Sequence, residues 1–208
     1  RICRQSTTIT IYVNIIFALI GLFAVILILI FTILWIYIFI HVTPQYDGVM
    51  YFKGIRNSTR IQRDENGVIH IIAQNHHDMF FAQGVAFAQD RLFQMELFRR
   101  IGRGTLSELV GSTAIPLDKM SRTLGLYRAS QEAKRYLRNE TLLVLQAFVD
   151  GVNEYLNSNP HLPFEFLLIS YRPINFTIED VIVSSKLLSL MMSGNSWQEI
   201  ARYMLLQR

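Results

Sequence analysis

An uninterrupted hydrophobic run near the N-terminus dominates the pattern of the chain. Residues 15–40 are 26 positions without a charged side chain, and most are Ile, Leu, Phe, Val or Ala. A helix of that length would extend about 39 Å, more than the roughly 30 Å hydrocarbon core of a bilayer. The run is apolar on every face, unlike a helix on the surface of a soluble domain. It predicts one transmembrane helix over residues 15–40, after a short flank at residues 1–14.

Two alternatives compete with an uncleaved membrane anchor. A buried helix of a soluble core rarely exceeds the length that crosses a bilayer. A cleaved secretory signal has an apolar region of about 7–15 residues and ends in a small-x-small site, whereas this run leads into His-Val-Thr-Pro at residues 41–44. Arg1 and Arg4 precede the run, and the next basic residue after His41 is Lys53. We therefore expect a single-pass membrane protein with a cytoplasmic N-terminus and an extracellular or lumenal C-terminal domain.

A linker and a hairpin are expected after the run. Residues 41–59 contain Pro and Gly but no periodic apolar pattern, which is typical of a linker. Residues 60–63 and 68–72 are two short runs of strand type, and they flank an Asn66-Gly67 pair. Asn-Gly favours the positive φ angles of a tight turn, so this segment predicts a β-hairpin.

Apolar residues at spacings of three and four predict helices over much of the remaining chain. Asp78 is expected to cap the first of these helices, and Gly102 or Gly104 to end it. Thr177 and Asp180 form the pattern of a capping box at the start of a later helix. The predicted helices span residues 78–101, 139–156, 177–192 and 197–206. With the hairpin, they give a mostly helical α+β class for residues 60–208.

Composition and charge add few constraints. The net charge is +4, and the basic clusters at residues 99–103 and 134–138 fit either solvated helix faces or sites for phosphate or an anionic membrane surface. Solvated faces are the simpler interpretation. No nucleic-acid motif accompanies the clusters, so no nucleic-acid partner is expected. Cys3 is the only cysteine, which excludes a disulfide framework beyond the membrane run.

Three Asn-x-Ser/Thr sequons are candidate glycosylation sites. Asn57, Asn139 and Asn175 all lie on the C-terminal side of the hydrophobic run. They are usable only if that side is lumenal in a eukaryotic cell, which agrees with the orientation expected from the flanking charges.

The residues alone do not define an active site. The histidines lack the spacing of a zinc protease, and no Gly-x-Ser-x-Gly elbow, phosphate-binding loop or dinucleotide motif occurs. Asp90 and Glu96, within a mostly apolar helix, fit either acid/base catalysis or structural ion pairs with Arg91 or Arg99. The ion pairs are the favoured interpretation.

A series of motifs in one order resembles the penicillin acylase family. Two of them are Arg-Asp-Glu-Asn-Gly-Val-Ile-His-Ile at residues 63–71 and the segment of residues 81–96, which ends in Gln-Asp-Arg-Leu-Phe-Gln-Met-Glu. Others lie at residues 102–111, 122–126, 146–153 and 162–166. The resemblance covers about residues 60–206. Ile69 stands where the family commonly has Pro, and Phe176 where it commonly has Trp.

The resemblance implies an N-terminal-nucleophile hydrolase, a precursor that cuts itself into an α chain and a β chain. In that family the new N-terminal Ser of the β chain attacks an amide carbonyl while its own α-amine accepts the proton. The present sequence resembles only the α-chain portion of the αββα fold. We therefore expect no catalytic residue in this chain, and we expect the β-chain portion of the same precursor to be its partner.

Two further roles follow from the same resemblance. Glu199 matches the position from which the α chain supplies one ligand to a calcium ion, and the other ligands would come from the missing β chain. The alternative for Glu199 is an ordinary surface residue early in a helix. Ser189, Met192 and Ser193 fall where the family lines its acyl pocket, and their alternative is simple helix packing. A Ser inside a chain lacks a free α-amine, so Ser193 is not expected to be the nucleophile.

The sequence leaves three functional hypotheses. The first is the N-terminal fragment of a membrane-anchored amidase that hydrolyses linear amides of penicillin or N-acyl type. The second is a non-catalytic membrane-tethered module that retains the acylase fold. The third keeps the enzyme but makes it an acyl-homoserine-lactone or cephalosporin acylase. In each case membrane lipid would surround the anchor, and isolated residues 44–208 are expected to expose apolar helix faces.

Overall fold

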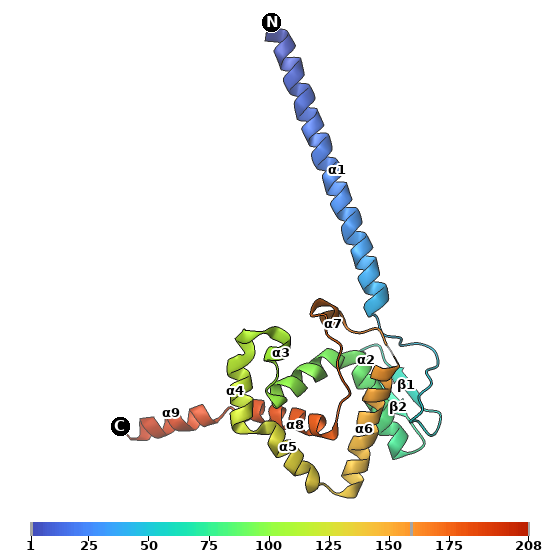
Figure 1. Ribbon diagram of the computed structural model, residues 1–208, viewed down its shortest axis with the longest axis vertical. Helices are drawn as coiled ribbons and strands as arrows, with labels where there is room; N and C mark the ends of the chain where they lie inside the picture. Colours follow the sequence, from blue (N-terminus) through green and yellow to red (C-terminus); the bar gives the residue numbers. More distant parts are fainter. Residues whose placement is uncertain (1, 159, 208) are drawn as a thin grey trace. The chain divides into compact units, whose positions relative to one another are not determined.

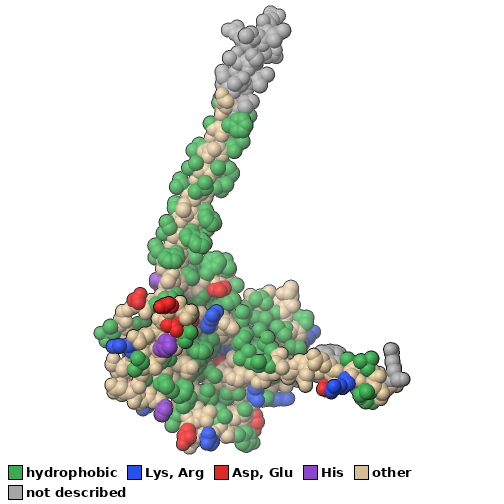
Figure 2. Space-filling view, turned by 180° about the vertical axis from the view of Figure 1, so that it is seen from behind, with side chains coloured by type: hydrophobic (Ala, Val, Ile, Leu, Met, Phe, Trp, Pro, Cys, Tyr) green, Lys and Arg blue, Asp and Glu red, His purple; other side chains and the backbone are tan. Residues whose placement is uncertain are grey.

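The computed structural model describes residues 2–158 and 160–207, which divide into two compact units, Arg1–Thr43 and Pro44–Arg208. The first unit is one helix, α1 (Ile2–Val42), which extends beyond both ends of the predicted span. Its segment Asn14–Ile40 has a mean hydropathy of 3.2, and none of it is buried. Figure 2 shows hydrophobic side chains along this helix. By length and composition, α1 is able to cross a membrane.

The second unit is mostly helical, with one two-stranded sheet (Figure 1). Its elements in chain order are β1 (Arg60–Arg63), β2 (Ile69–Ile72), α2 (His76–Arg103), α3 (Ser107–Val110), η1 (Ser112–Ala114), α4 (Ile115–Leu124), α5 (Leu126–Arg135), α6 (Asn139–Asn157), α7 (Phe164–Leu168), α8 (Ile178–Met192) and α9 (Ser196–Leu206).

The predicted hairpin is confirmed. Strands β1 and β2 pair antiparallel, with Arg60 opposite Ile72. The turn is stabilised by Asp64, whose Oδ1 accepts hydrogen bonds from the backbone N–H groups of Asn66 and Val68, both at 2.9 Å. The carboxylate thereby satisfies two backbone donors that the short ladder leaves unpaired.

Helices α2 and α6 form the centre of the core. At their crossing both helices carry glycine: a Cβ on Gly84 would lie 2.1 Å from the carbonyl oxygen of Phe148, and a Cβ on Gly151 would lie 2.0 Å from that of Phe81. Only glycine permits such an approach of two backbones. Around the crossing, α2 contributes Phe81, Val85, Ala88 and Leu92, and α6 contributes Val149, Val152, Tyr155 and Leu156.

The ends of α2 differ in part from the prediction. The N-cap is Asn75, not Asp78, because the Asn75 side chain accepts a hydrogen bond from the Asp78 backbone N–H at 2.8 Å. Gly104 ends the helix in the left-handed conformation. Gly102 stays inside the helix, where a Cβ would lie 2.6 Å from a methyl group of Val183.

The segment predicted to be a linker belongs largely to the second unit. Residues 44–59 have no regular secondary structure, but Met50, Phe52 and Ile55 pack against the core. Their irregular spacing carries no periodic signal. The folded unit therefore begins at Pro44 and includes these residues.

Short helices between residues 107 and 135 were not predicted. One buried carboxylate organises their start: Asp118 of α4 accepts hydrogen bonds from the backbone N–H groups of Leu106 and Ser107, both at 2.8 Å. These helices depend on such tertiary hydrogen bonds, because helices of this length are marginal alone.

The two C-terminal helices are confirmed. The Thr177 backbone N–H donates to Asp180 Oδ2 at 2.9 Å, as expected for the predicted cap of α8. Helix α8 packs against α2 and α5 (Figure 1), and α9 follows after a break at residues 193–195.

Candidate functional site

The predicted acyl-pocket residues lie at the C-terminal end of α8. Ser189, Met192 and Ser193 are all exposed, and Met192 has 87% of its surface accessible. Ser189 Oγ donates to the carbonyl oxygen of Ser185 at 2.9 Å, and Ser193 Oγ donates to that of Leu190 at 2.8 Å. Spacings of three and four place the three side chains toward one side of the chain. Among the described residues, each hydroxyl donates to a backbone carbonyl and not to a base.

Glu199, the predicted calcium ligand, is exposed in the first turn of α9. Within residues 2–158 and 160–207, no group of three His, Cys, Asp or Glu side chains is placed to hold a metal ion. A calcium ion takes six to eight oxygen ligands, of which Glu199 would supply one.

The three sequons are accessible. Asn57, Asn139 and Asn175 are exposed: the first lies before the hairpin, the second begins α6, and the third lies before α8. Exposure is required of a glycan acceptor, and all three residues meet this requirement.

Glu96 is the centre of a buried ionic cluster in α2. It is fully buried and accepts hydrogen bonds from Arg99 and, at 2.7 Å, from Arg100. Arg99 also donates to the carbonyl oxygen of Ile174 at 3.0 Å, and its guanidinium lies 4.1 Å from the ring centre of Phe176. The favoured interpretation of Glu96 as a structural ion pair is confirmed. Phe176, one of the departures from the family pattern, supplies the aromatic face of this cluster.

The cluster continues from the end of α2 to the start of α8. Arg103 donates to buried Asp180 at 2.6 Å, and its guanidinium lies 4.5 Å from the ring centre of Tyr127 in α5. Arg100 reaches Glu108 at 2.9 Å. The basic sequence cluster at residues 99–103 is thus a set of ion-paired side chains, not a solvated face, and it ties α2 to α5 and α8.

Asp90 also forms an ion pair, but with a partner that the sequence did not indicate. Its carboxylate accepts a hydrogen bond at 3.0 Å from Arg63 at the end of β1, not from Arg91. Arg91 is exposed and has non-helical backbone angles that kink α2. The pair with Arg63 is non-local, so helical spacing gave no signal for it.

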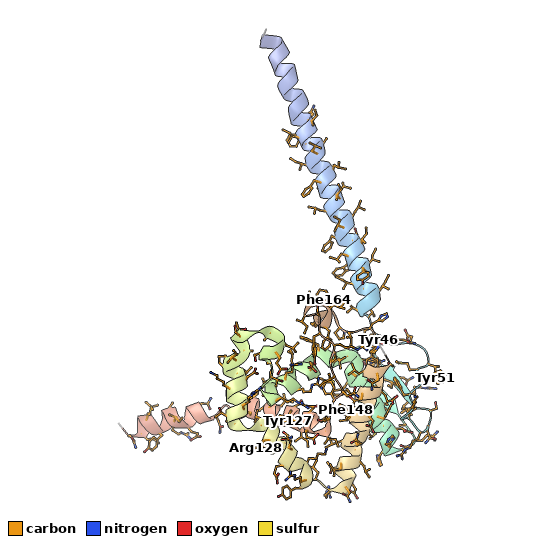
Figure 3. The ribbon with its side chains drawn as sticks, viewed as in Figure 1. Tyr46, Tyr51, Tyr127, Arg128, Phe148 and Phe164 are labelled. Atoms are coloured by element: carbon orange, nitrogen blue, oxygen red, sulfur yellow. The ribbon has the colours of Figure 1, made fainter. Side chains whose placement is uncertain are left out.

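A cavity of about 520 Å³ lies beside this pair. It is lined by residues 45–52, by residues 55–61 and by side chains of α2 that include Phe81. Tyr46 lies at the hairpin side (Figure 3), with the Arg63 guanidinium 4.4 Å from its ring centre. Burial raises the pKa of Tyr46, and the Asp90 carboxylate adds to the effect. The phenol is therefore neutral at physiological pH and suits binding more than base catalysis.

Asp78 fixes the irregular segment before the hairpin onto α2. Its fully buried carboxylate accepts hydrogen bonds from the backbone N–H groups of Arg56 at 3.0 Å and Asn57 at 2.8 Å. Burial alone would raise its pKa, but these bonds, together with those from His77 and Asn75, lower the pKa from 3.8 to about 2. The carboxylate is thus a structural anchor.

Replacing Asp78 is expected to remove pH-dependent stability. Since the folded-state pKa lies below the unfolded value, the carboxylate stabilises the fold above about pH 4, and this contribution is lost as the pH falls toward 2. We expect Asp78→Asn to lower the free energy of unfolding by about 2 kcal/mol at pH 7 and to flatten the acid dependence. Pulse proteolysis of the full chain in urea, at a series of pH values, measures both effects.

Asp47→Asn is the matched control for Asp78→Asn, because Asp47 is exposed. It should change the free energy of unfolding by less than about 0.5 kcal/mol. Equal stability of Asp78→Asn and the unmodified protein at pH 7 would disprove the anchoring role.

The fold defines the class of protein: a mostly helical domain with one small two-stranded sheet, which resembles the fold of the acylases. The chain belongs to the penicillin amidase family, whose model matches residues 58–208.

Individual relatives support this assignment. The chain is 35% identical over 163 residues to penicillin acylase 2 proenzyme of Pseudomonas sp. (strain SE83), a match that covers 78% of this chain and 21% of that protein. It is 32% identical over 166 residues to acyl-homoserine lactone acylase QuiP of Pseudomonas aeruginosa, which covers 79% of this chain and 20% of that protein. The chain therefore spans about a fifth of the length of these relatives.

A solved acylase shares the fold. The structure of a thermostable penicillin G acylase from Alcaligenes faecalis superposes with a TM-score of 0.58 at 26% identity. The match covers 68% of this chain and 75% of the matched chain. The predicted membership of the penicillin acylase family is confirmed.

Proposed function

We propose that this chain is the N-terminal part of a membrane-anchored amidase that hydrolyses linear amides of N-acyl type, with its nucleophilic Ser in a following segment of the same precursor. The observation that carries the proposal is the match of residues 58–208 to the penicillin amidase family. One relative of the chain is named as a penicillin acylase proenzyme. Because the chain spans only about a fifth of that proenzyme, most of the proposed enzyme lies outside it.

The proposed chemistry takes place on the second chain. Cleavage of the precursor would expose a Ser whose hydroxyl attacks the amide carbonyl while its α-amine accepts the proton. The carbonyl oxygen then becomes an oxyanion that hydrogen-bond donors stabilise, the amine leaves with the proton, and water hydrolyses the acyl-enzyme. Ser189, Met192 and Ser193 would line the acyl group from the side of α8. Their exposure supports this role, because they are free to contact a second chain or a substrate.

Exposed apolar side chains support the need for a second chain. Met191 and Met192 at the end of α8 have 66% and 87% of their surface accessible, and Leu205 and Leu206 at the end of α9 have 71% and 80%. Large exposed apolar side chains gathered at the end of an element mark an interaction site. We propose that the β-chain portion of the precursor covers them.

Calcium and membrane anchoring remain proposals of the same kind. Glu199 would supply one carboxylate oxygen to a calcium ion whose other ligands come from the second chain, which would help to hold the two chains together. Helix α1 would anchor the enzyme in lipid with its N-terminus cytoplasmic. The unburied apolar surface of Asn14–Ile40 supports the anchoring, and the basic residues before it favour the orientation.

An acyl-homoserine lactone acylase is the second candidate function. It rests on the 32% identity to QuiP of Pseudomonas aeruginosa. Ser193 is small and follows the exposed Met192. A small side chain beside the proposed acyl group would leave room for a long aliphatic acyl chain.

The test is amide hydrolysis by the complete precursor. Expressed from its continuous coding sequence, the protein should release amine from phenylacetyl amides or from N-acyl homoserine lactones, and the preferred amide decides between the two candidates. Replacing the first Ser of the second chain by Ala should lower kcat by about a thousandfold or more. Ser112→Ala, an exposed site in η1, should leave kcat unchanged. A precursor that hydrolyses neither amide would favour the non-catalytic module.

A further inference from the structure

We propose that a small pocket where α4 meets α5 binds a phosphate-type oxyanion, either free phosphate or a phosphate monoester. The pocket has a volume of about 170 Å³ and lies at the end of α2. The residues that line it include Arg103, Ser121, Arg122, Tyr127 and Arg128. Figure 3 labels Tyr127 and Arg128, which come from the first turn of α5. This site is separate from the proposed acyl pocket and does not depend on the proposed enzymatic activity.

The first argument is a buried hydroxyl. Ser121 has only 1% of its surface accessible, and its Oγ finds no hydrogen-bond partner in the part of the chain that the structure describes. A buried hydroxyl without a partner is unfavourable and calls for an explanation such as a ligand. Ser121 lines the pocket, so an anion oxygen bound there would accept its hydrogen bond.

The second argument is an excess of positive charge at the pocket. Arg128 forms no ion pair within residues 2–158 and 160–207, and its Nη2 lies 3.2 Å from the position that a Cβ on Gly125 would take. Arg122 donates through Nε to the carbonyl oxygen of Gly104 at 2.7 Å, and its terminal nitrogens make no other hydrogen bond among the described residues. Both arginines are exposed at the pocket, and the planar fork of a guanidinium matches the oxygens of a phosphate.

Nearby carboxylates offset two of the three arginines that line the pocket. Asp180 is bound to Arg103 at 2.6 Å and is also close to Arg99, at 3.9 Å. Asp118 faces Arg122 and offsets its charge, while both carboxylate oxygens accept backbone hydrogen bonds at residues 106 and 107. The uncompensated charge is therefore that of Arg128, which leaves one net positive charge for an anion.

The helix that follows adds a third, weaker contribution. Helix α5 has ten residues, begins after Gly125, and has no side-chain cap and no acidic residue in its first turn. The free N–H groups and the positive end of the helix dipole favour an anion at this end. The pocket is too small for a drug-sized ligand, since such sites usually have 300–1,000 Å³. A compact tetrahedral anion is the class of ligand that fits.

Calorimetric titration of the full chain in a non-ionic detergent tests the site, with inorganic phosphate as the probe and chloride at matched ionic strength as the reference. Saturable binding of phosphate is expected, and Arg128→Gln and Ser121→Ala should each weaken it by about tenfold. Arg138→Gln removes the same charge beyond the far end of α5 and should leave the affinity unchanged within about twofold. Ser121 Oγ has no partner among the described residues, so Ser121→Ala should keep its stability.

A second titration identifies the source of the anion. Glycerol phosphate that competes with inorganic phosphate would extend the site to phosphate monoesters such as lipid headgroups, whereas failure to compete would restrict it to the free anion. Both results support the site. The proposal would be overturned if phosphate bound no more tightly than chloride. It would also be overturned if neither Arg128→Gln nor Ser121→Ala weakened phosphate binding.

Discussion

Gly151→Ala is expected to destabilise the second unit by about 3 kcal/mol or more, although alanine is the better helix former. A Cβ at position 151 would lie 2.0 Å from the carbonyl oxygen of Phe81 and 2.9 Å from its carbonyl carbon. These are backbone atoms of α2, so no side-chain rotation relieves the clash. The helices would have to separate and would open the core that contains Phe81 and Val152.

Urea unfolding followed by pulse proteolysis of the full chain measures this effect. Gly194→Ala is the matched control, because a Cβ there would meet no atom within 4 Å. It should change the free energy of unfolding by less than about 0.5 kcal/mol. If Gly151→Ala were as stable as the control, the close crossing of α2 and α6 would be wrong.

Glu96→Gln is expected to lower the free energy of unfolding by about 3–5 kcal/mol. The substitution preserves size but removes the negative charge that faces the buried guanidinium of Arg99 and the partly buried one of Arg100. Arg99 has only 3% of its side-chain surface accessible, so water cannot replace the lost partner. The large effect comes from the loss of the nearest carboxylate to buried Arg99, which keeps only the more distant Asp180 at 3.9 Å. Arg100 keeps its pair with exposed Glu108 and contributes less.

Glu132→Gln is the matched control for Glu96→Gln, because it removes the same charge from an exposed ion pair. The pair of Glu132 and Arg135 is exposed, with 51% and 74% of the side-chain surfaces accessible, and should contribute less than about 1 kcal/mol. The same comparison tests the alternative acid/base role of Glu96. If Glu96→Gln abolished amide hydrolysis in the complete enzyme while leaving stability unchanged, Glu96 would be a catalytic residue and not a structural one.

The sequence predicted the elements that are stabilised by hydrogen bonds between residues close in the chain. The Asn66-Gly67 turn specified the hairpin, and Thr177 with Asp180 specified the start of α8. The short helices between residues 107 and 135 carried no comparable signal, because their start depends on the buried Asp118 carboxylate. The anchoring role of Asp78 also gave no local signal, because its hydrogen bonds go to Arg56 and Asn57, about twenty residues earlier.

The candidate site was less predictable than the fold. Family resemblance pointed to Ser189, Met192 and Glu199, but the structure leaves all three exposed, and their partners would come from another chain. In contrast, the Arg63 to Asp90 pair and the pocket around Ser121 join residues from different elements. No spacing rule along one helix or strand reports such contacts.

The most direct test of the central claim is the mass and N-terminal sequence of the protein produced from the continuous precursor gene. The proposal predicts two associated polypeptides: one that contains residues 58–206, and a larger one that begins with Ser, Thr or Cys. Replacing that first residue by Ala should leave a single uncut precursor. A mature protein that ends near Arg208 with no larger partner, or a precursor that is never cut, would contradict the assignment of this chain as the first part of a self-processing acylase.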